Sequence, residues 1–272
     1  MLLLAVPAGA AASEDVSFPD ANLEAAVRDA LRKPEEGITV DDMATLGVLD
    51  ADDRGISDLS GLEHAVNLQE LDLEGNEISD LGPLANLTNL RDLDLEDSKI
   101  SDLGPLANLA SLRNLDLEDN EINDLGPLAN LTDLRDLDLE DNEISDIGPL
   151  ANLTNLRDLD LEGNKISDIS PLANLTNLRD LGLEDNEIRD LGPLTNLTNL
   201  RDLDLEGNEI SDIGPLVANS GLGSGDSVKV RHNNLDLTSG SAAMKDIEAL
   251  ERRGVDVDYM PQHSRSNHAP QQ

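Results

Sequence analysis

Leucine and isoleucine recur at fixed positions of a 22-residue unit that repeats along most of the chain. The segment at 133–154, DLRDLDLEDNEISDIGPLANLT, closely matches the segments at 111–132 and 155–176. Eight such units fit between residues 45 and 220, and a degenerate ninth unit follows. Within each unit, Leu-x-Leu alternates apolar and polar side chains, which predicts one short strand with leucines on its inner face. A single unit cannot bury its own leucines, so the units must stack into a common core.

The pattern L-x-x-L-x-L-x-x-N-x-I is the signature of leucine-rich repeats. In the unit at 133–154 it is carried by Leu134, Leu137, Leu139, Asn142 and Ile144. It predicts an α/β repeat solenoid shaped as a horseshoe, with a parallel β-sheet on the concave side and short 3-10 or turn segments on the convex side. The asparagine is expected to bond backbone groups of the buried turn, which would otherwise stay unpaired.

The two ends of such an array would expose leucines, so caps are expected. Residues 13–44 are predicted to form a helical N-terminal cap, with one helix after Asp20 and a shorter one starting at Thr39. Residues 221–260 are predicted to hold the degenerate ninth repeat and a C-terminal cap, made of a helix that Gly254 ends and a strand at 255–259. Residues 261–272 are polar and are expected to be disordered.

The first twelve residues, MLLLAVPAGAAA, have the pattern of a signal-peptide remnant. A short apolar run leads into Ala8-Gly9-Ala10, which suits signal peptidase, although no positively charged start precedes it. The alternative is a disordered apolar N-terminus. No other stretch approaches the ~20 apolar residues that span a bilayer, so we expect no membrane-spanning segment.

The amino-acid composition argues against several classes of partner and of catalytic activity. Lys and Arg number 19 against 57 Asp and Glu, a formal net charge of −38, which argues against nucleic acid and anionic membranes as partners. The chain has no cysteine, which excludes disulfides and thiol catalysis, and its only aromatic residues are Phe18 and Tyr259. It lacks the G-x-S-x-G and H-E-x-x-H motifs, so no catalytic residue is predicted and the chain is not expected to be an enzyme.

The predicted concave face is strongly acidic, because the outward strand positions form columns of Asp and Glu. Beside them runs a column of arginines at 91, 113, 135, 157, 179 and 201, which can pair with the neighbouring aspartates but would neutralise at most six of them. We take the acidic residues of the central units as the candidate binding residues. They are Asp92, Asp94, Glu96, Asp116, Glu118, Asp136, Asp138, Glu140, Asp158, Asp160, Glu162, Asp180 and Glu184.

Like charges ~4.8 Å apart repel by roughly 0.9 kcal/mol in water, so something should offset these columns. High ambient salt, bound cations or a basic partner could each do so. The segment Asp50–Gly55 begins like an EF-hand loop, but Arg54 stands at a ligand position and Gly61 where the bidentate Glu belongs. We therefore predict no metal site and no cofactor, and favour loose binding of Ca²⁺ or other cations over specific sites.

The last unit reverses the charge of the columns through Lys229, Arg231 and His232. These residues either close off the acidic columns or mark one end of a binding site, and the sequence leaves both interpretations open.

The motif I-S-D-L-x-P-L-x-N-L-T-N-L, together with the preceding FPDANLEAAVRDAL, resembles the internalin type of bacterial leucine-rich repeat over roughly residues 18–220. This resemblance implies an exported, surface-associated or secreted protein that grips another protein with its concave face. Internalins that bind host receptors carry aromatic residues on that face, and this chain has none there.

We therefore expect a monomeric, non-catalytic protein-binding or adhesion module, secreted or at the cell surface, whose acidic concave face engages a basic protein. The alternative is a structural or cation-binding protein of the cell envelope in a salt-adapted organism, where the acid serves solubility and salt tolerance.

Overall fold

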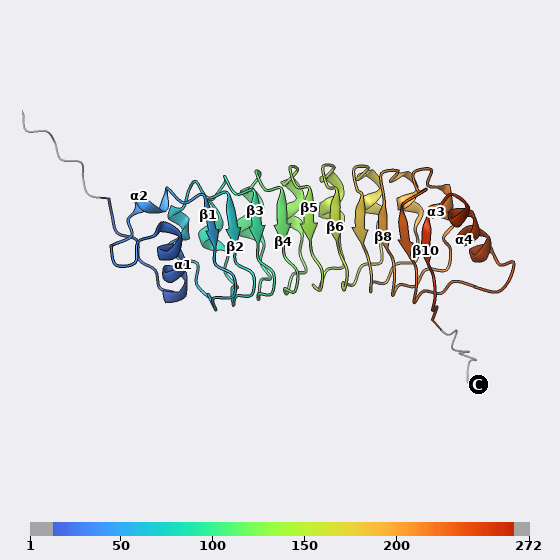
Figure 1. Cartoon of the computed structure of the whole chain (residues 1–272), viewed down its shortest axis with the longest axis horizontal. Coiled ribbons are helices and arrows are strands. Elements are labelled where there is room, and N and C mark those ends of the chain that lie inside the picture. Colours follow the sequence, from blue (N-terminus) through green and yellow to red (C-terminus); the bar gives the residue numbers. More distant parts are fainter. Residues whose placement is uncertain (1–12, 264–272) are drawn as a thin grey trace, which may run out of the picture.

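The computed structural model describes residues 13–263, which form one elongated solenoid (Figure 1). Ten parallel strands pair in sequence order, so that each strand lies beside the strand of the next repeat. Residues 22 positions apart are partners over most of the sheet, as Leu137 is with Leu159. The fold predicted from the repeat pattern is confirmed. The strands are β1 Val48–Asp50, β2 Glu70–Asp72, β3 Asp92–Asp94, β4 Asn114–Asp116, β5 Asp136–Asp138, β6 Asp158–Asp160, β7 Asp180–Gly182, β8 Asp202–Asp204, β9 Ser227–Lys229 and β10 Asp256–Asp258.

Short helical turns form the side of the solenoid opposite the sheet, and all of them after the first begin at Gly-Pro or Ser-Pro. In the repeat turn, Asp124 Oδ1 accepts the N–H of Gly126 at 2.8 Å, and the same bond recurs in neighbouring repeats. These aspartates therefore stabilise the turn by a hydrogen bond and also make its surface hydrophilic. The segments are the 3-10 helices η1 Leu62–His64, η2 Gly82–Leu84, η3 Gly104–Asn108, η4 Gly126–Asn130, η5 Gly148–Asn152, η6 Ser170–Asn174 and η7 Gly192–Asn196, and the short α-helix α3 Gly214–Ala218.

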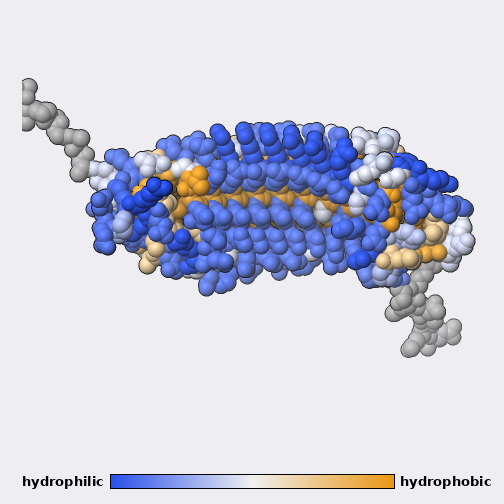
Figure 2. All heavy atoms as spheres, viewed as in Figure 1, coloured by the Kyte–Doolittle hydropathy of each residue, from blue (hydrophilic) through white to orange (hydrophobic). Residues whose placement is uncertain are grey.

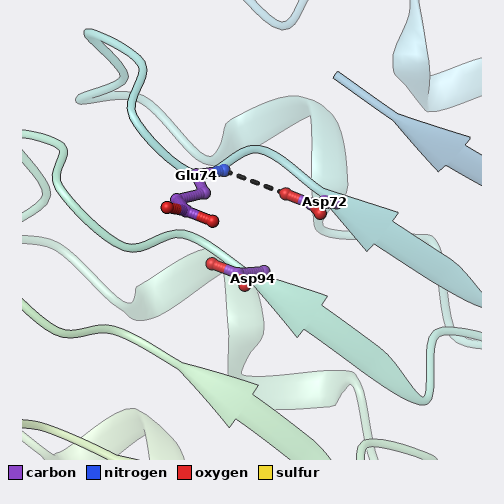
Figure 3. A group of neighbouring side chains, drawn as sticks. All are labelled: Asp72, Glu74 and Asp94. Atoms are coloured by element: carbon purple, nitrogen blue, oxygen red, sulfur yellow. Dashed lines mark hydrogen bonds between the residues drawn. The ribbon is translucent and has the colours of Figure 1, made fainter. Parts of the chain in front are cut away.

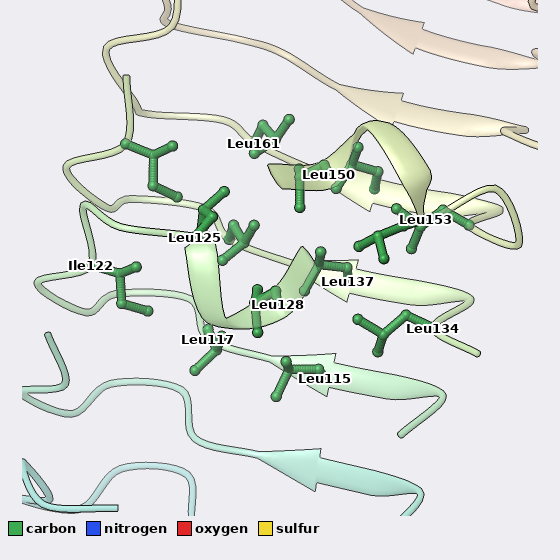
Figure 4. Close-up of a cluster of buried hydrophobic side chains, with 14 of the residues drawn as sticks. Leu115, Leu117, Ile122, Leu125, Leu128, Leu134, Leu137, Leu150, Leu153 and Leu161 are labelled. Carbon is green, nitrogen blue, oxygen red and sulfur yellow. The ribbon is translucent and has the colours of Figure 1, made fainter. Parts of the chain in front are cut away.

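The core is a stack of aliphatic side chains between the sheet and these turns (Figure 4). One repeat contributes Leu115 and Leu117 from its strand, Ile122 from the loop, and Leu125 and Leu128 from the convex side, all at most 2% exposed. Since burial of each such side chain is worth ~1.5–3 kcal/mol, stacking accounts for most of the stability of the array.

Asparagines beneath the sheet join the repeats, as predicted. Asn142 Nδ2 donates to the carbonyls of Leu117 (2.9 Å), Leu139 (3.3 Å) and Glu140 (3.0 Å), and its Oδ1 accepts the N–H of Ile122 at 2.9 Å. Each asparagine thus satisfies groups of its own repeat and of the preceding one. The equivalent residues are Asn76, Asn120, Asn164, Asn186 and Asn208.

The N-terminal cap consists of α1 Ala21–Leu31, which packs against β1, and α2 Val40–Met43, which begins at Thr39. The side chain of Asp20 caps α1 by accepting the N–H groups of Asn22 and Leu23. Its other oxygen accepts the N–H groups of Ser57 and Asp58 in the first repeat, so one carboxylate fastens the cap to the array.

The C-terminal cap consists of α4 Ala242–Arg252, which packs against α3 and β10. Residues 261–263 continue from β10 as an ordered segment, which corrects the expectation that they belong to a disordered tail. The N–H of His232 donates to the carbonyl of Pro261 at 2.7 Å, and Gln262 Nε2 donates to the carbonyl of Val230 at 2.8 Å. These bonds satisfy backbone groups of the last repeat, which the polar composition alone did not predict.

The expected signal-peptide remnant at 1–12 lies outside the described residues. Within residues 13–263, no helix is both long and apolar enough to cross a membrane.

Candidate functional site

A long groove runs along the exposed face of the sheet from β1 to β9, with a volume of about 920 Å³. Its floor is the row of central strand leucines, such as Leu93, Leu115 and Leu137, which are 2–3% exposed. Figure 2 shows this floor as a narrow hydrophobic band between hydrophilic rows. The groove therefore combines an apolar base with polar walls along the whole array.

All thirteen predicted binding residues lie on this face, in three rows. The first row precedes the leucine of each strand and the second follows it, so the two rows flank the floor. The third row consists of glutamates just beyond the strand ends. The rows are Asp92, Asp136, Asp158 and Asp180; Asp94, Asp116, Asp138 and Asp160; and Glu96, Glu118, Glu140, Glu162 and Glu184.

The aspartates of the second row are fixed by their own backbone. Asp138 Oδ1 accepts the N–H of Glu140 at 3.0 Å, and Asp94 and Asp116 make the same bond to Glu96 and Glu118 at 3.1 Å. Each aspartate keeps its second oxygen free to face the groove.

Second-row aspartates and third-row glutamates come together in groups of three, because the strands are in register. Carboxylate oxygens of Asp72, Glu74 and Asp94 lie within 4.8 Å of one another (Figure 3). Four more groups of this kind repeat along the sheet. They are Asp94, Glu96 and Asp116; Asp116, Glu118 and Asp138; Asp138, Glu140 and Asp160; and Glu184, Asp204 and Glu206.

Gly182 interrupts this series, because it stands in β7 at the position where strands β1 to β6 and β8 carry aspartate. A Cβ at Gly182 would lie only 2.3 Å from Asp160 Oδ1, so the carboxylate of Asp160 occupies the space above the glycine. The second row therefore has a break between β6 and β8, whereas the first and third rows continue through Asp180 and Glu184.

Partial burial, helped by neighbouring carboxylates, raises the pKa of several of these acids. The pKa of Asp138 rises to about 6, and that of Glu118, Glu140 and Glu162 to about 7. Burial is the largest cause in each case, and for Glu140 the charge of Glu162 comes next. Part of the acidic face is therefore protonated near neutral pH, which lowers the repulsion within the rows.

The basic residues of the last repeat close the acidic rows. Lys229 Nζ lies 2.6 Å from Asp204 Oδ2, and Arg231 holds Glu206 through two bonds of 2.9 Å. Hydrogen bonding to Arg231 lowers the pKa of Glu206, opposite to the shifts along the central rows. Of the two interpretations left open by the sequence, the geometry favours closure of the acidic rows.

The arginine column forms no ion pair with the aspartates beside it in the part of the chain that the structure describes, although the sequence allowed such pairing. Within residues 13–263, Arg91, Arg113, Arg135, Arg157 and Arg179 form no ion pair, and only Arg201 does, with Asp226 at 3.3 Å. These arginines immediately precede the strands and line grooves at the edge of the sheet. Neighbouring positions in an extended segment face different directions, which keeps the arginines beyond ion-pair distance of these aspartates. Burial raises the pKa of Asp158 and Asp180, and the nearby charge of Arg179 opposes this rise.

Comparison with known proteins agrees with the repeat fold described above. The family model described as "Leucine Rich repeats (2 copies)" matches residues 66–108, 110–152, 134–174 and 176–218, more than half of the chain. A comparison with curated protein sequences gave no match.

Among solved structures, the chain is similar to internalin C2 of Listeria monocytogenes, with 39% identity and a TM-score of 0.72 over 75% of this chain and 91% of that one. It is also similar to the internalin InlF of the same organism, with 30% identity and a TM-score of 0.58 over 90% of this chain and 91% of that one. A leucine-rich-repeat protein of Leptospira interrogans shares the fold at 24% identity and a TM-score of 0.61, over 73% of this chain and 57% of that one. The chain therefore belongs to the leucine-rich-repeat proteins, and among them to the internalin-like bacterial group.

Proposed function

We propose that this chain is a non-catalytic protein-binding or adhesion module whose concave groove engages a basic protein. Leucine-rich-repeat proteins are typically protein-interaction or adhesion modules, which supports the general class. The observation that carries the specific proposal is the pairing of a leucine floor with two flanking rows of carboxylates. Lys and Arg side chains of a partner can lay their methylene stems on such a floor while their charged ends reach the walls.

Without aromatic side chains on this face, the groove offers many similar contacts rather than a few dominant ones. Binding should therefore be fast, salt-sensitive and distributed over several repeats. We further propose that the protein acts as a monomer, secreted or at the cell surface, which its similarity to internalins supports.

The test measures binding of a synthetic lysine-rich peptide by titration calorimetry at low salt. Replacing Asp116 and Asp138 together by Asn removes two groove charges while preserving the shape of both side chains, and should weaken binding about tenfold. The matched control replaces Glu121 and Glu187 by Gln. These two glutamates are exposed, lie outside the groove and form no ion pair within residues 13–263. Equal losses in both double variants would contradict the proposal, because they would show attraction to net charge alone.

A second candidate, a structural or cation-binding envelope protein, is favoured by the groups of three carboxylates within 4.8 Å. Thermal unfolding in NaCl and CaCl₂ at matched ionic strength distinguishes the candidates. If CaCl₂ raises the melting temperature more than NaCl does at the same ionic strength, the carboxylates bind calcium at specific sites. If the two salts raise it equally, they act by screening charge only.

A further inference from the structure

Five arginines form a continuous stripe beside the concave groove, at the residue that immediately precedes β3 to β7. This arginine stripe consists of Arg91, Arg113, Arg135, Arg157 and Arg179, all of them exposed. The N–H of each arginine after the first donates to the carbonyl of the previous one at 2.7–2.8 Å. The backbone therefore sets the guanidinium groups at the strand spacing of ~4.8 Å.

Unpaired arginines are unusual in a chain with 57 acidic and 19 basic residues. On the opposite edge of the solenoid, Lys99, Lys165 and Arg189 each contact a glutamate of a neighbouring repeat. Arg201, which continues the stripe, pairs with the buried carboxylate of Asp226 and so ends it. The five members of the stripe form no ion pair within residues 13–263, so a row of cations is left available to a ligand.

The surroundings of the stripe are neutral and polar on the side away from the groove. A depression of about 360 Å³ lies there, between four of the arginines and a row of asparagines, with Asp133 as the one acidic residue in its lining. Asn155 and Asn177 each donate one amide hydrogen to a threonine carbonyl of the preceding repeat at 2.8 Å. These bonds fix the orientation of the amides and leave their oxygens and second hydrogens available, beside the exposed Thr154 and Thr176.

We propose that the arginine stripe binds a linear polysaccharide of carboxylated sugars that lies along the solenoid axis. Guanidinium groups bind carboxylates through two parallel hydrogen bonds, and the amides and hydroxyls beside them match sugar hydroxyls. One pyranose unit advances such a polymer by close to the distance between neighbouring strands, so each arginine lies beside one sugar and binds either its carboxylate or its hydroxyls, depending on which of these faces the stripe. An extended acidic peptide presents same-side carboxylates every ~6.8 Å and falls out of step with the stripe.

The polymer should lie on the asparagine side of the stripe. On its other side, the arginines share a groove with the first row of aspartates, including Asp136 and Asp158, which would repel a carboxylated ligand. The proposal concerns a different surface from the acidic concave groove, so it does not depend on the function proposed for that groove.

The test measures binding of oligogalacturonates of increasing length to the full chain by titration calorimetry in ~0.15 M NaCl, which screens the long-range repulsion between the polymer and the net charge of −38. Replacing Arg135 and Arg157 together by Gln should weaken binding at least about tenfold. The matched control replaces Lys165 and Arg189 by Gln, which removes the same charge from the opposite edge and should change affinity less than about twofold. Affinity should rise with oligomer length until the polymer spans the five arginines.

Three results would overturn the proposal: no binding of any oligogalacturonate, equal losses in the two double variants, or polyglutamate bound as tightly as oligogalacturonate of equal charge. The last result would assign the stripe to acidic peptides. Circular dichroism of each variant separates loss of binding from loss of fold, and none of these outcomes bears on binding of a basic peptide in the concave groove.

Discussion

Ser98 occupies the position that Asn120 holds one repeat later, and its buried hydroxyl has no hydrogen-bond partner within residues 13–263. Asn120 donates to the carbonyls of Leu95, Leu117 and Glu118 and accepts the N–H of Ile100. The serine is too short to span these distances, so the asparagine ladder has a gap at the third repeat.

Replacing Ser98 by Asn should close this gap and stabilise the protein by about 1–2 kcal/mol, since each net hydrogen bond is worth ~0.5–1.5 kcal/mol. Urea unfolding followed by circular dichroism measures the change. Ser101→Asn, the same substitution at an exposed position, is the control and should leave stability unchanged. A loss of stability in Ser98→Asn would show that the third repeat is packed for serine and cannot accommodate the amide.

Removing an intact member of the ladder should have the opposite effect. Asn142→Ala leaves the N–H of Ile122 without its partner in the interior. It also removes one of the two amides that donate to the carbonyl of Leu117, the other being Asn120. Because a buried polar group that loses its only partner costs ~1–3 kcal/mol, we expect a loss of about 1–3 kcal/mol in urea unfolding. An effect below about 0.5 kcal/mol would mean that water replaces the amide.

Stability should depend on pH through the central acidic rows. The folded-state pKa of Glu118, Glu140 and Glu162 is about 7, above the ordinary value of 4.5, so the folded protein binds more protons than the unfolded chain between these values. This stabilisation is complete below pH ~4.5 and is lost as pH rises through about 7. The melting temperature should therefore fall by a few degrees between about pH 5.5 and pH 8.

Glu140→Gln provides the control for this pH dependence. The variant should melt higher than the natural chain at about pH 8 and show a smaller change with pH, because one raised carboxyl is gone. Glu121→Gln, at an exposed position outside the acidic rows, should keep the full pH dependence. If both variants behave alike, net charge rather than the crowding of the rows governs stability.

The repeat period predicted the strands, the core leucines, the asparagine ladder and the three acidic rows, because each depends only on which face of a strand a position occupies. The raised pKa of Asp138 could not be predicted in this way. It depends on how far the carboxylate is buried, opposed by the backbone bond from Glu140 that lowers it. The free arginines were also missed, since pairing depends on the direction of long side chains rather than on their order in the sequence.

The ion pair between Arg231 and Glu206 closes the acidic rows at their C-terminal end, and its contribution to stability can be tested by substitution. Arg231 binds both oxygens of Glu206, whose side chain is only 12% exposed, and also lies 3.6 Å from Asp258. Arg231→Gln would leave Glu206 without this charge partner, beside Asp204 and Glu184 in the same acidic group. The pKa of Glu206 should then rise above its present lowered value, and the melting temperature at neutral pH should fall.

Adding Glu206→Gln to this variant should restore most of the lost stability, because the uncompensated charge is removed together with its partner. If the double variant stays as unstable as Arg231→Gln, the arginine acts by packing between the last two strands rather than by closing the acidic rows.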